Sequence, residues 1–175
     1  MIQKAFEIPG FFDEMIKHRD KISKETRFME NFIQGELWSE YKNAYKNVDL
    51  VFPIVKYFDG LEARNALASR AGKQALGGIY FSFLCMPPHL IGKMGYIFPL
   101  AIFHERYMKE YGTVAVFGKC IEDVNIVSKK GVLINVKGKQ KRAYFPCVLL
   151  SGDNTAMNDM CGFSASFTAT YYSRI

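Results

Sequence analysis

The sequence predicts an α/β or α+β domain in which helices and strands alternate around a mixed sheet, and α/β is the class we adopt. Three observations predict this class. Nearly half of the 175 residues are hydrophobic and 15% are aromatic, which suffices for the core of one domain of this length. Apolar residues recur at helical spacing in some segments and form β-branched and aromatic runs in others. The connections between the early and the late runs are long enough for crossovers.

Two helices are predicted before any strand. Apolar residues in 11–22 lie at helical spacing with charges between them, and residues 36–46 form a short aromatic and charged segment around Trp38. We expect residues 1–47 to form a helical N-terminal extension and residues 48–175 to form the sheet domain. Trp38 could stack on nucleic-acid bases, although an aromatic residue that packs a helix is the commoner case.

Two strands are predicted next, over residues 48–58 and 76–86, because Val, Phe, Ile, Leu and Tyr dominate both segments. Pro53 indicates that the first is an edge strand or carries a bulge, since proline has no N–H to donate to a neighbour. Asp59 and Gly60 are expected to end this first strand. The pair Pro87-Pro88 is expected to end the second.

The second half of the chain is predicted to contain two helices and two further strands. The helices cover residues 96–111 and 113–128 and are separated by Gly112; in the latter, Val114, Phe117, Ile121 and Val124 share one helix face. A hairpin follows. Its return strand is expected over residues 143–150, which are continuously apolar and lead into the turn-forming stretch 151–154.

The net charge of the chain is concentrated in one segment. The chain has 23 Lys and Arg against 17 Asp and Glu, a balance of +6 (23 − 17), and residues 129–142 hold six basic residues and no acid. Val132, Ile134 and Val136 alternate with other residues before a Lys137-Gly138-Lys139 turn, which predicts a β-hairpin with a basic tip. This hairpin is either solvated, with lysines that prevent edge pairing, or a finger that contacts DNA phosphates. The contacting side chains would be Lys129, Lys130, Lys137, Lys139, Lys141 and Arg142.

Neither a membrane span nor a secreted location is expected. The longest uncharged stretch, residues 74–92, contains a Gly-Gly and a Pro-Pro pair, which would leave backbone groups unpaired in lipid. The N-terminus lacks the apolar core of a signal peptide. The four cysteines form no Cys-x-x-Cys pair, so we expect an intracellular, reducing location.

Asp59 and Asp153 are the candidate catalytic residues, because each is predicted to follow an apolar strand. Ligands of open α/β sheets gather at strand ends. Two carboxylates brought together repel, so they would share a proton or bind a hard divalent cation such as Mg²⁺ or Mn²⁺. A pair of such ions can activate a hydroxyl and stabilise the leaving oxygen of a phosphodiester. The ordinary alternatives are a hairpin turn at Asp59 and a helix cap or Asx turn at Asp153.

The segments around these aspartates resemble a known family. Residues 57–69 read Tyr-Phe-Asp-Gly-Leu-Glu-Ala-Arg-Asn-Ala-Leu-Ala-Ser. They resemble the segment around the first catalytic Asp of transposon-encoded proteins related to the CACTA transposases. Residues 149–158, which read Leu-Leu-Ser-Gly-Asp-Asn-Thr-Ala-Met-Asn, resemble the second Asp block of that family. Shorter similar stretches are Gly35-Glu36-Leu37-Trp38, Met86-Pro87-Pro88, Glu110-Tyr111-Gly112, Gly162-Phe163 and Ser166-Phe167.

The resemblance implies an incomplete ribonuclease H-like fold over residues 48–175 with a DDE-type active site. In that fold the first Asp lies on the first strand and the second at or just after the fourth, so Asp59 and Asp153 would hold Mg²⁺ or Mn²⁺. The implied reaction is metal-dependent cleavage and joining of DNA strands, with DNA as the partner and the nucleus as the location. The third acid of the family lies beyond the position of Ile175. The chain is therefore expected to be the N-terminal part of such a core, inactive on its own. Ser173 stands where the family has the first Cys of a possible zinc pair.

Three functions follow from these patterns. The first is a fragment of a metal-dependent transposase core, the second is a non-catalytic transposon-derived domain that binds DNA or protein, and the third is an unrelated α/β domain whose hairpin contacts a partner. Glu62 could support a metal at Asp59 or be an ordinary surface acid. The third function predicts that Asp59 and Asp153 do not converge.

Overall fold

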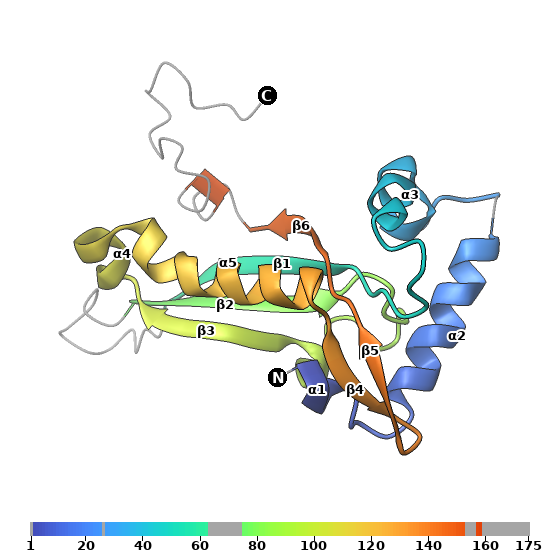
Figure 1. Cartoon of the computed structure of the whole chain (residues 1–175). Helices are drawn as coiled ribbons and strands as arrows, with labels where there is room; N and C mark the ends of the chain where they lie inside the picture. Colours follow the sequence, from blue (N-terminus) through green and yellow to red (C-terminus); the bar gives the residue numbers. More distant parts are fainter. Residues whose placement is uncertain (1, 26, 63–74, 153–156, 159–175) are drawn as a thin grey trace. The chain divides into compact units, whose positions relative to one another are not determined.

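The computed structural model describes residues 2–25, 27–62, 75–152 and 157–158. The helices are α1 (Ile2–Ala5), α2 (Phe11–Lys24), α3 (Glu36–Asn43), α4 (Arg106–Tyr111) and α5 (Thr113–Lys129), with 3₁₀ turns η1 (Phe32–Gln34) and η2 (Met94–Tyr96). The strands are β1 (Ile54–Glu62), β2 (Ala75–Phe83), β3 (Phe98–His104), β4 (Val132–Val136), β5 (Lys139–Ala143) and β6 (Cys147–Ser151) (Figure 1).

The mixed sheet that the sequence predicts is confirmed. β3, β2, β1 and β6 form a four-stranded sheet in that order, whereas β4 and β5 form a separate two-stranded sheet. Figure 1 shows β1, β3 and β6 pointing the same way and β2 the opposite way. β1 is an inner strand, so the edge position predicted from Pro53 is wrong. Pro53 lies just before β1, where the N–H groups of Phe52 and Ile54 donate to the carbonyls of Tyr144 and Pro146.

The chain forms two compact units, each with its own apolar core. Unit 1 comprises Met1–Val55, Ser82–Phe98 and Val124–Val148. Unit 2 comprises Lys56–Phe81, Pro99–Asp123 and Leu149–Ile175. In the part of the chain that the structure describes, no helix is both long enough and apolar enough to cross a membrane.

Phenylalanine rings form the centre of unit 1. The ring of Phe6 lies 5.3–5.7 Å from four others, measured between centroids, and further contacts of the same kind link the cluster. Because a phenylalanine ring buries a large apolar area and prefers tilted or edge contacts, this cluster joins segments that are far apart in the sequence. Its members are Phe6, Phe11, Phe52, Phe83, Phe98 and Phe145.

The core of unit 2 forms where α5 packs on one face of the strands. The ring edge of Phe117 meets Phe58 of β1 at 5.1 Å and Phe103 of β3 at 5.9 Å, and Ile79 and Cys120 complete the buried cluster. The predicted helix is confirmed, but its predicted inner face is wrong in part. Val114 is 86% exposed and Ile121 is 47% exposed, because the inner face runs through Phe117, Cys120 and Val124.

Two predictions for the second half of the chain are wrong in part. The helix predicted over residues 96–111 contains β3 in its first part, and only Arg106–Tyr111 is helical, ending at Gly112 as predicted. An uninterrupted apolar run has no periodicity that separates a strand from a helix, and pairing with β2 decides the outcome. The strand predicted over residues 143–150 exists as β6, Cys147–Ser151, but it belongs to the four-stranded sheet. The return strand of the hairpin is instead the charged β5.

Gly77 of β2 lies directly beneath the Phe103 ring. A Cβ atom at position 77 would lie 2.5 Å from Cζ of Phe103, whose ring is held between Phe58 and Phe117. We therefore expect Gly77→Ala to lower the free energy of unfolding by about 1–3 kcal/mol, measured by urea titration. Gly60→Ala is the matched control, because its Cβ would meet only the flexible carboxylate of Glu105 and should change stability by less than about 0.5 kcal/mol. Equal stability of the two variants would show that the Phe103 ring moves aside freely.

Candidate functional site

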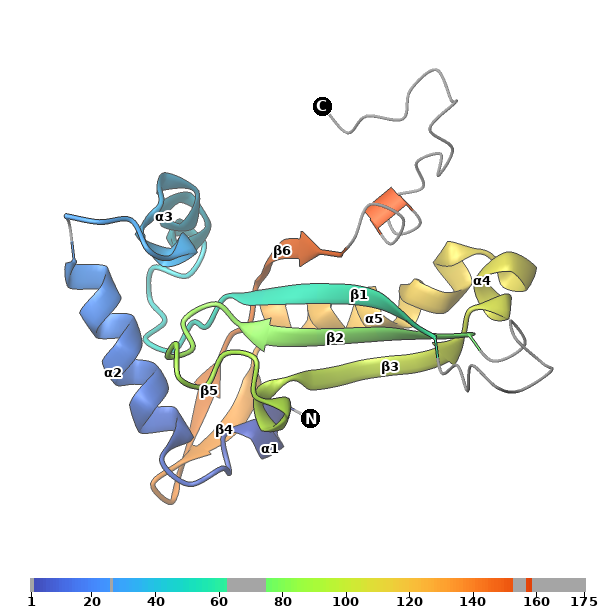
Figure 2. The same cartoon turned by 180° about the vertical axis from the view of Figure 1, so that it is seen from behind.

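Asp59 lies inside β1 rather than at its end, because the strand continues to Glu62. The sequence prediction that Asp59 and Gly60 close the strand is therefore wrong. Successive side chains on a strand point to opposite faces, and Phe58 packs against α5. Asp59 consequently points to the face of the sheet opposite α5, which is the face toward the viewer in Figure 2, and its side chain is exposed.

Two tyrosines accompany Asp59 on this face. The rings of Tyr57 and Tyr80 are stacked, with centroids 5.2 Å apart and planes inclined by 14°. Burial raises the pKa of Tyr80, and the negative charge of Asp59 raises it further. The Tyr80 hydroxyl therefore stays protonated and available as a donor. The arrangement places an exposed carboxylate beside two stacked, half-buried tyrosine rings.

Asp153 lies outside the described residues, and so does Ser173. Glu62 is the last residue of β1. In the described ranges, no group of three or more His, Cys, Asp or Glu side chains is placed to hold a metal ion.

The chain segments that lead into β1 and β6 run parallel in a defined register. Val51 and Tyr144 form a parallel bridge. The Tyr144 N–H donates to the Leu50 carbonyl, and the Phe52 N–H donates to the Tyr144 carbonyl, each at 2.9 Å. Partner residues here differ by 93 in number (144 − 51). β1 and β6, which these segments lead into, are neighbours in the sheet.

The predicted basic hairpin is confirmed. β4 and β5 pair antiparallel from Val132 opposite Ala143 to Val136 opposite Lys139, which leaves Lys137 and Gly138 as a two-residue turn. Both have positive φ, 52° and 79°, as the type I′ turn of a tight hairpin requires. The Asn135 side-chain oxygen accepts from the Gly138 N–H at 3.0 Å and fixes this turn.

The cations of the hairpin differ in their surroundings. Lys137 at the tip lies 3.0 Å from an Asp13 carboxylate oxygen. The Arg142 guanidinium donates to the Lys130 carbonyl at 2.8 Å, which holds it against the start of the hairpin. The remaining predicted DNA contacts are exposed and, among the described residues, have no carboxylate within 4 Å. These are Lys129, Lys130, Lys139 and Lys141.

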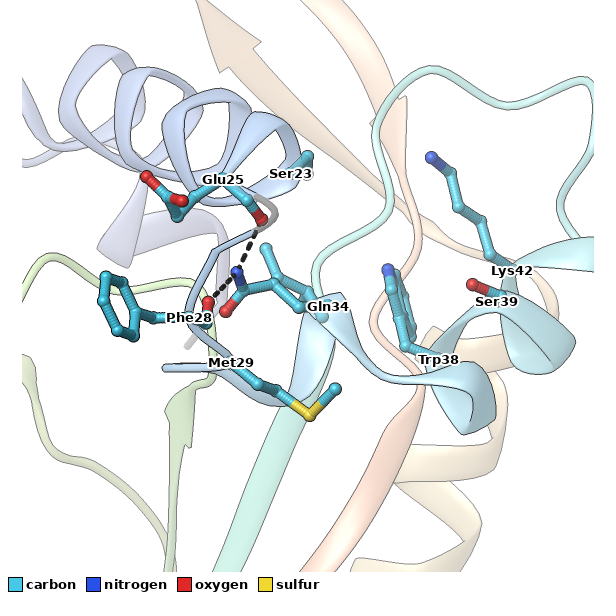
Figure 3. A pocket seen from close by; sticks show the side chains of 9 residues that line it. Ser23, Glu25, Phe28, Met29, Gln34, Trp38, Ser39 and Lys42 are labelled. Atoms are coloured by element: carbon cyan, nitrogen blue, oxygen red, sulfur yellow. Dashed lines mark hydrogen bonds between the residues drawn. The ribbon is translucent and has the colours of Figure 1, made fainter.

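A groove of about 440 Å³ between α2 and α3 is a feature that the sequence did not predict. Figure 3 shows the Gln34 side chain in its wall, donating to the carbonyls of Glu25 and Phe28 at 3.0 and 2.9 Å. Its oxygen accepts from two backbone N–H groups of the same loop. The amide thus organises the loop rather than facing a ligand.

Trp38 is 7% exposed and packs on Phe32, so the helix-packing role expected for it is confirmed.

Two of the described cysteines, Cys85 and Cys120, are buried and carry free thiols. Burial raises the pKa of the Cys85 thiol to about 12, so it stays protonated near neutral pH.

Comparison with known proteins finds no relative of the chain. No protein-family model, curated protein or solved structure matches it.

Proposed function

We propose that the chain is the N-terminal part of a DDE-type transposase-like core that cuts and joins DNA strands with Mg²⁺ or Mn²⁺. One observation carries the proposal. β1, which holds Asp59, is the sheet neighbour of β6, which ends at Ser151, two residues before Asp153. β6 is also the fourth strand of this sheet in chain order, which supports the ribonuclease H-like fold that the resemblance implies.

The chain positions of the two aspartates support the proposal. β1 and β6 are neighbouring strands, which lie about 4.8 Å apart. Asp59 and Asp153 differ by 94 in number (153 − 59), and the segments that lead into these strands pair with an offset of 93 at Val51 and Tyr144.

The donor set suits a hard cation. Both groups are carboxylates, and an oxygen-only site favours Mg²⁺ or Mn²⁺. When bound, such ions supply charge stabilisation for a phosphodiester that is attacked by water or by a 3′ hydroxyl. In this proposal Asp59 presents its carboxylate to the metal on an exposed face of the sheet. Tyr57 and Tyr80 offer aromatic rings on which a base beside the reacting phosphate can stack.

Mn²⁺ binding tests the proposal. We expect isothermal titration calorimetry to detect Mn²⁺ binding to the wild-type chain. Asp59→Asn and Asp153→Asn should each weaken Mn²⁺ binding by at least about tenfold. Loss of a residue that only supports a metal ligand already weakens metal binding by about tenfold, so loss of a ligand should cost at least as much. Asp123→Asn is the matched control, because this substitution removes the same charge from an exposed acid of α5 that pairs with Lys119. Equal Mn²⁺ affinity of Asp59→Asn and Asp123→Asn would refute the site.

A second candidate is a non-catalytic domain that binds nucleic acid, which the exposed lysines of the hairpin favour. The same titration separates the two functions. A chain that binds DNA but takes up no Mn²⁺ would support this second function.

A further inference from the structure

A cleft of about 370 Å³ opens beside the basic hairpin within unit 1. Asn47 and Asp49 line it from the segment before β1, Lys141 and Arg142 line it from β5, and Tyr144 lines it just after β5. The two segments are hydrogen-bonded at Leu50 and Tyr144. In the described part of the chain, no backbone hydrogen bond joins them before that point, so the cleft lies where they separate.

We propose that this cleft binds a phosphate group of a nucleic-acid backbone, with Lys141 and Arg142 as the contacting cations. The inference rests on the DNA binding of the proposed function but not on the metal site at Asp59. Lys141 and Arg142, which both line the cleft, carry an ammonium and a guanidinium, and the planar guanidinium suits the oxygens of a phosphate.

The charge balance of the cleft favours an anion. Lys141 and Arg142 outnumber Asp49, the acid in the lining. Arg142 is positioned before any ligand binds, because one of its nitrogens already donates to the Lys130 carbonyl. The cleft also has a firm wall, since the Tyr144 ring packs against Tyr45 at 5.6 Å and the Tyr45 hydroxyl bonds to Ser128 at 3.0 Å.

The cleft, rather than the hairpin tip, carries this inference. The tip cation Lys137 is matched by the Asp13 carboxylate at 3.0 Å, whereas no carboxylate lies within 4 Å of the Lys141 ammonium among the described residues. A polymer of phosphates fits better than a single phosphate, because exposed Lys129, Lys130 and Lys139 extend the positive surface along the hairpin.

The test measures binding of a short fluorescent DNA duplex by anisotropy at several salt concentrations. Lys141→Gln combined with Arg142→Gln should weaken binding by about tenfold at low salt and reduce the slope of log affinity against log salt by about 2. Lys17→Gln combined with Lys21→Gln removes the same charge from the exposed face of α2 and should leave the slope unchanged. Lys141→Arg combined with Arg142→Lys preserves both charges and should retain most of the affinity for DNA. This variant and the double Gln variant should both unfold at the urea midpoint of the wild-type chain.

Each alternative outcome overturns the inference. Equal losses of DNA affinity in the cleft variant and the α2 variant would show that binding depends on net charge alone. Displacement of the duplex by inorganic phosphate at equal phosphate concentration would assign the cleft to free phosphate. Absence of DNA binding in the wild-type chain would also overturn it, whereas the loss of Mn²⁺ binding expected for Asp59→Asn would be unaffected. The failures of the cleft and of the metal site are thus distinguishable.

Discussion

Replacing Phe145 with alanine is expected to lower the free energy of unfolding by about 3–5 kcal/mol, the usual range for a fully buried phenylalanine. The Phe145 side chain is 0% exposed, and its ring lies 5.7, 5.9 and 6.0 Å from the rings of Phe6, Phe52 and Phe83. Together with Phe145, these partners come from all three segments of unit 1. The cavity would therefore open where the segments meet, and none of them can close it alone.

Urea unfolding followed by Trp38 fluorescence measures this loss, because Trp38 is the single tryptophan of the chain and lies in unit 1. Phe28→Ala is the matched control, since the Phe28 side chain is 68% exposed and its loss should change stability by less than about 0.5 kcal/mol. A loss below about 1 kcal/mol for Phe145→Ala would contradict the packing of the cluster.

The elements that the sequence predicts correctly are those with a strong local signal. α2 and α5 have helical spacing of apolar residues, and the hairpin has alternation on β4 with Lys137-Gly138 at its turn. β3 lacks such a signal, because its apolar residues occupy both faces, and its conformation depends on pairing with β2. The conformation of such a segment is decided by contacts distant in sequence.

The candidate sites divide in the same way. Asp59 could be selected from the sequence because it follows an apolar run, and the structure gives it an exposed position on β1. The stacking of Tyr57 on Tyr80 requires the register of β1 and β2, which no local pattern reveals. The cleft requires Asn47 and Lys141, far apart in the sequence, to lie on its opposite sides. The positive charge of the cleft can be predicted from the sequence, but its concave shape cannot.

The basic hairpin depends on one glycine for its position, which gives a further large expected effect. Gly131, between α5 and β4, has φ +67°, and a Cβ there would lie 2.8 Å from the backbone oxygen of Ala143. Gly131→Ala should therefore destabilise by about 2–4 kcal/mol in urea unfolding, since left-handed strain of about 1–2 kcal/mol adds to a clash that no side-chain rotation relieves.

Gly138→Ala separates these two contributions. Gly138 has φ +79°, but a Cβ added there would meet no atom within 4 Å apart from its chain neighbours. This variant therefore carries the strain without the clash and should lose about 1–2 kcal/mol. Because Arg142 and Tyr144 also border the space at Gly131, Gly131→Ala should disturb the cleft and weaken DNA binding, whereas Gly138→Ala should not. Equal losses of stability would mean that the Ala143 carbonyl moves without cost, and that the hairpin is attached more loosely than its hydrogen bonds indicate.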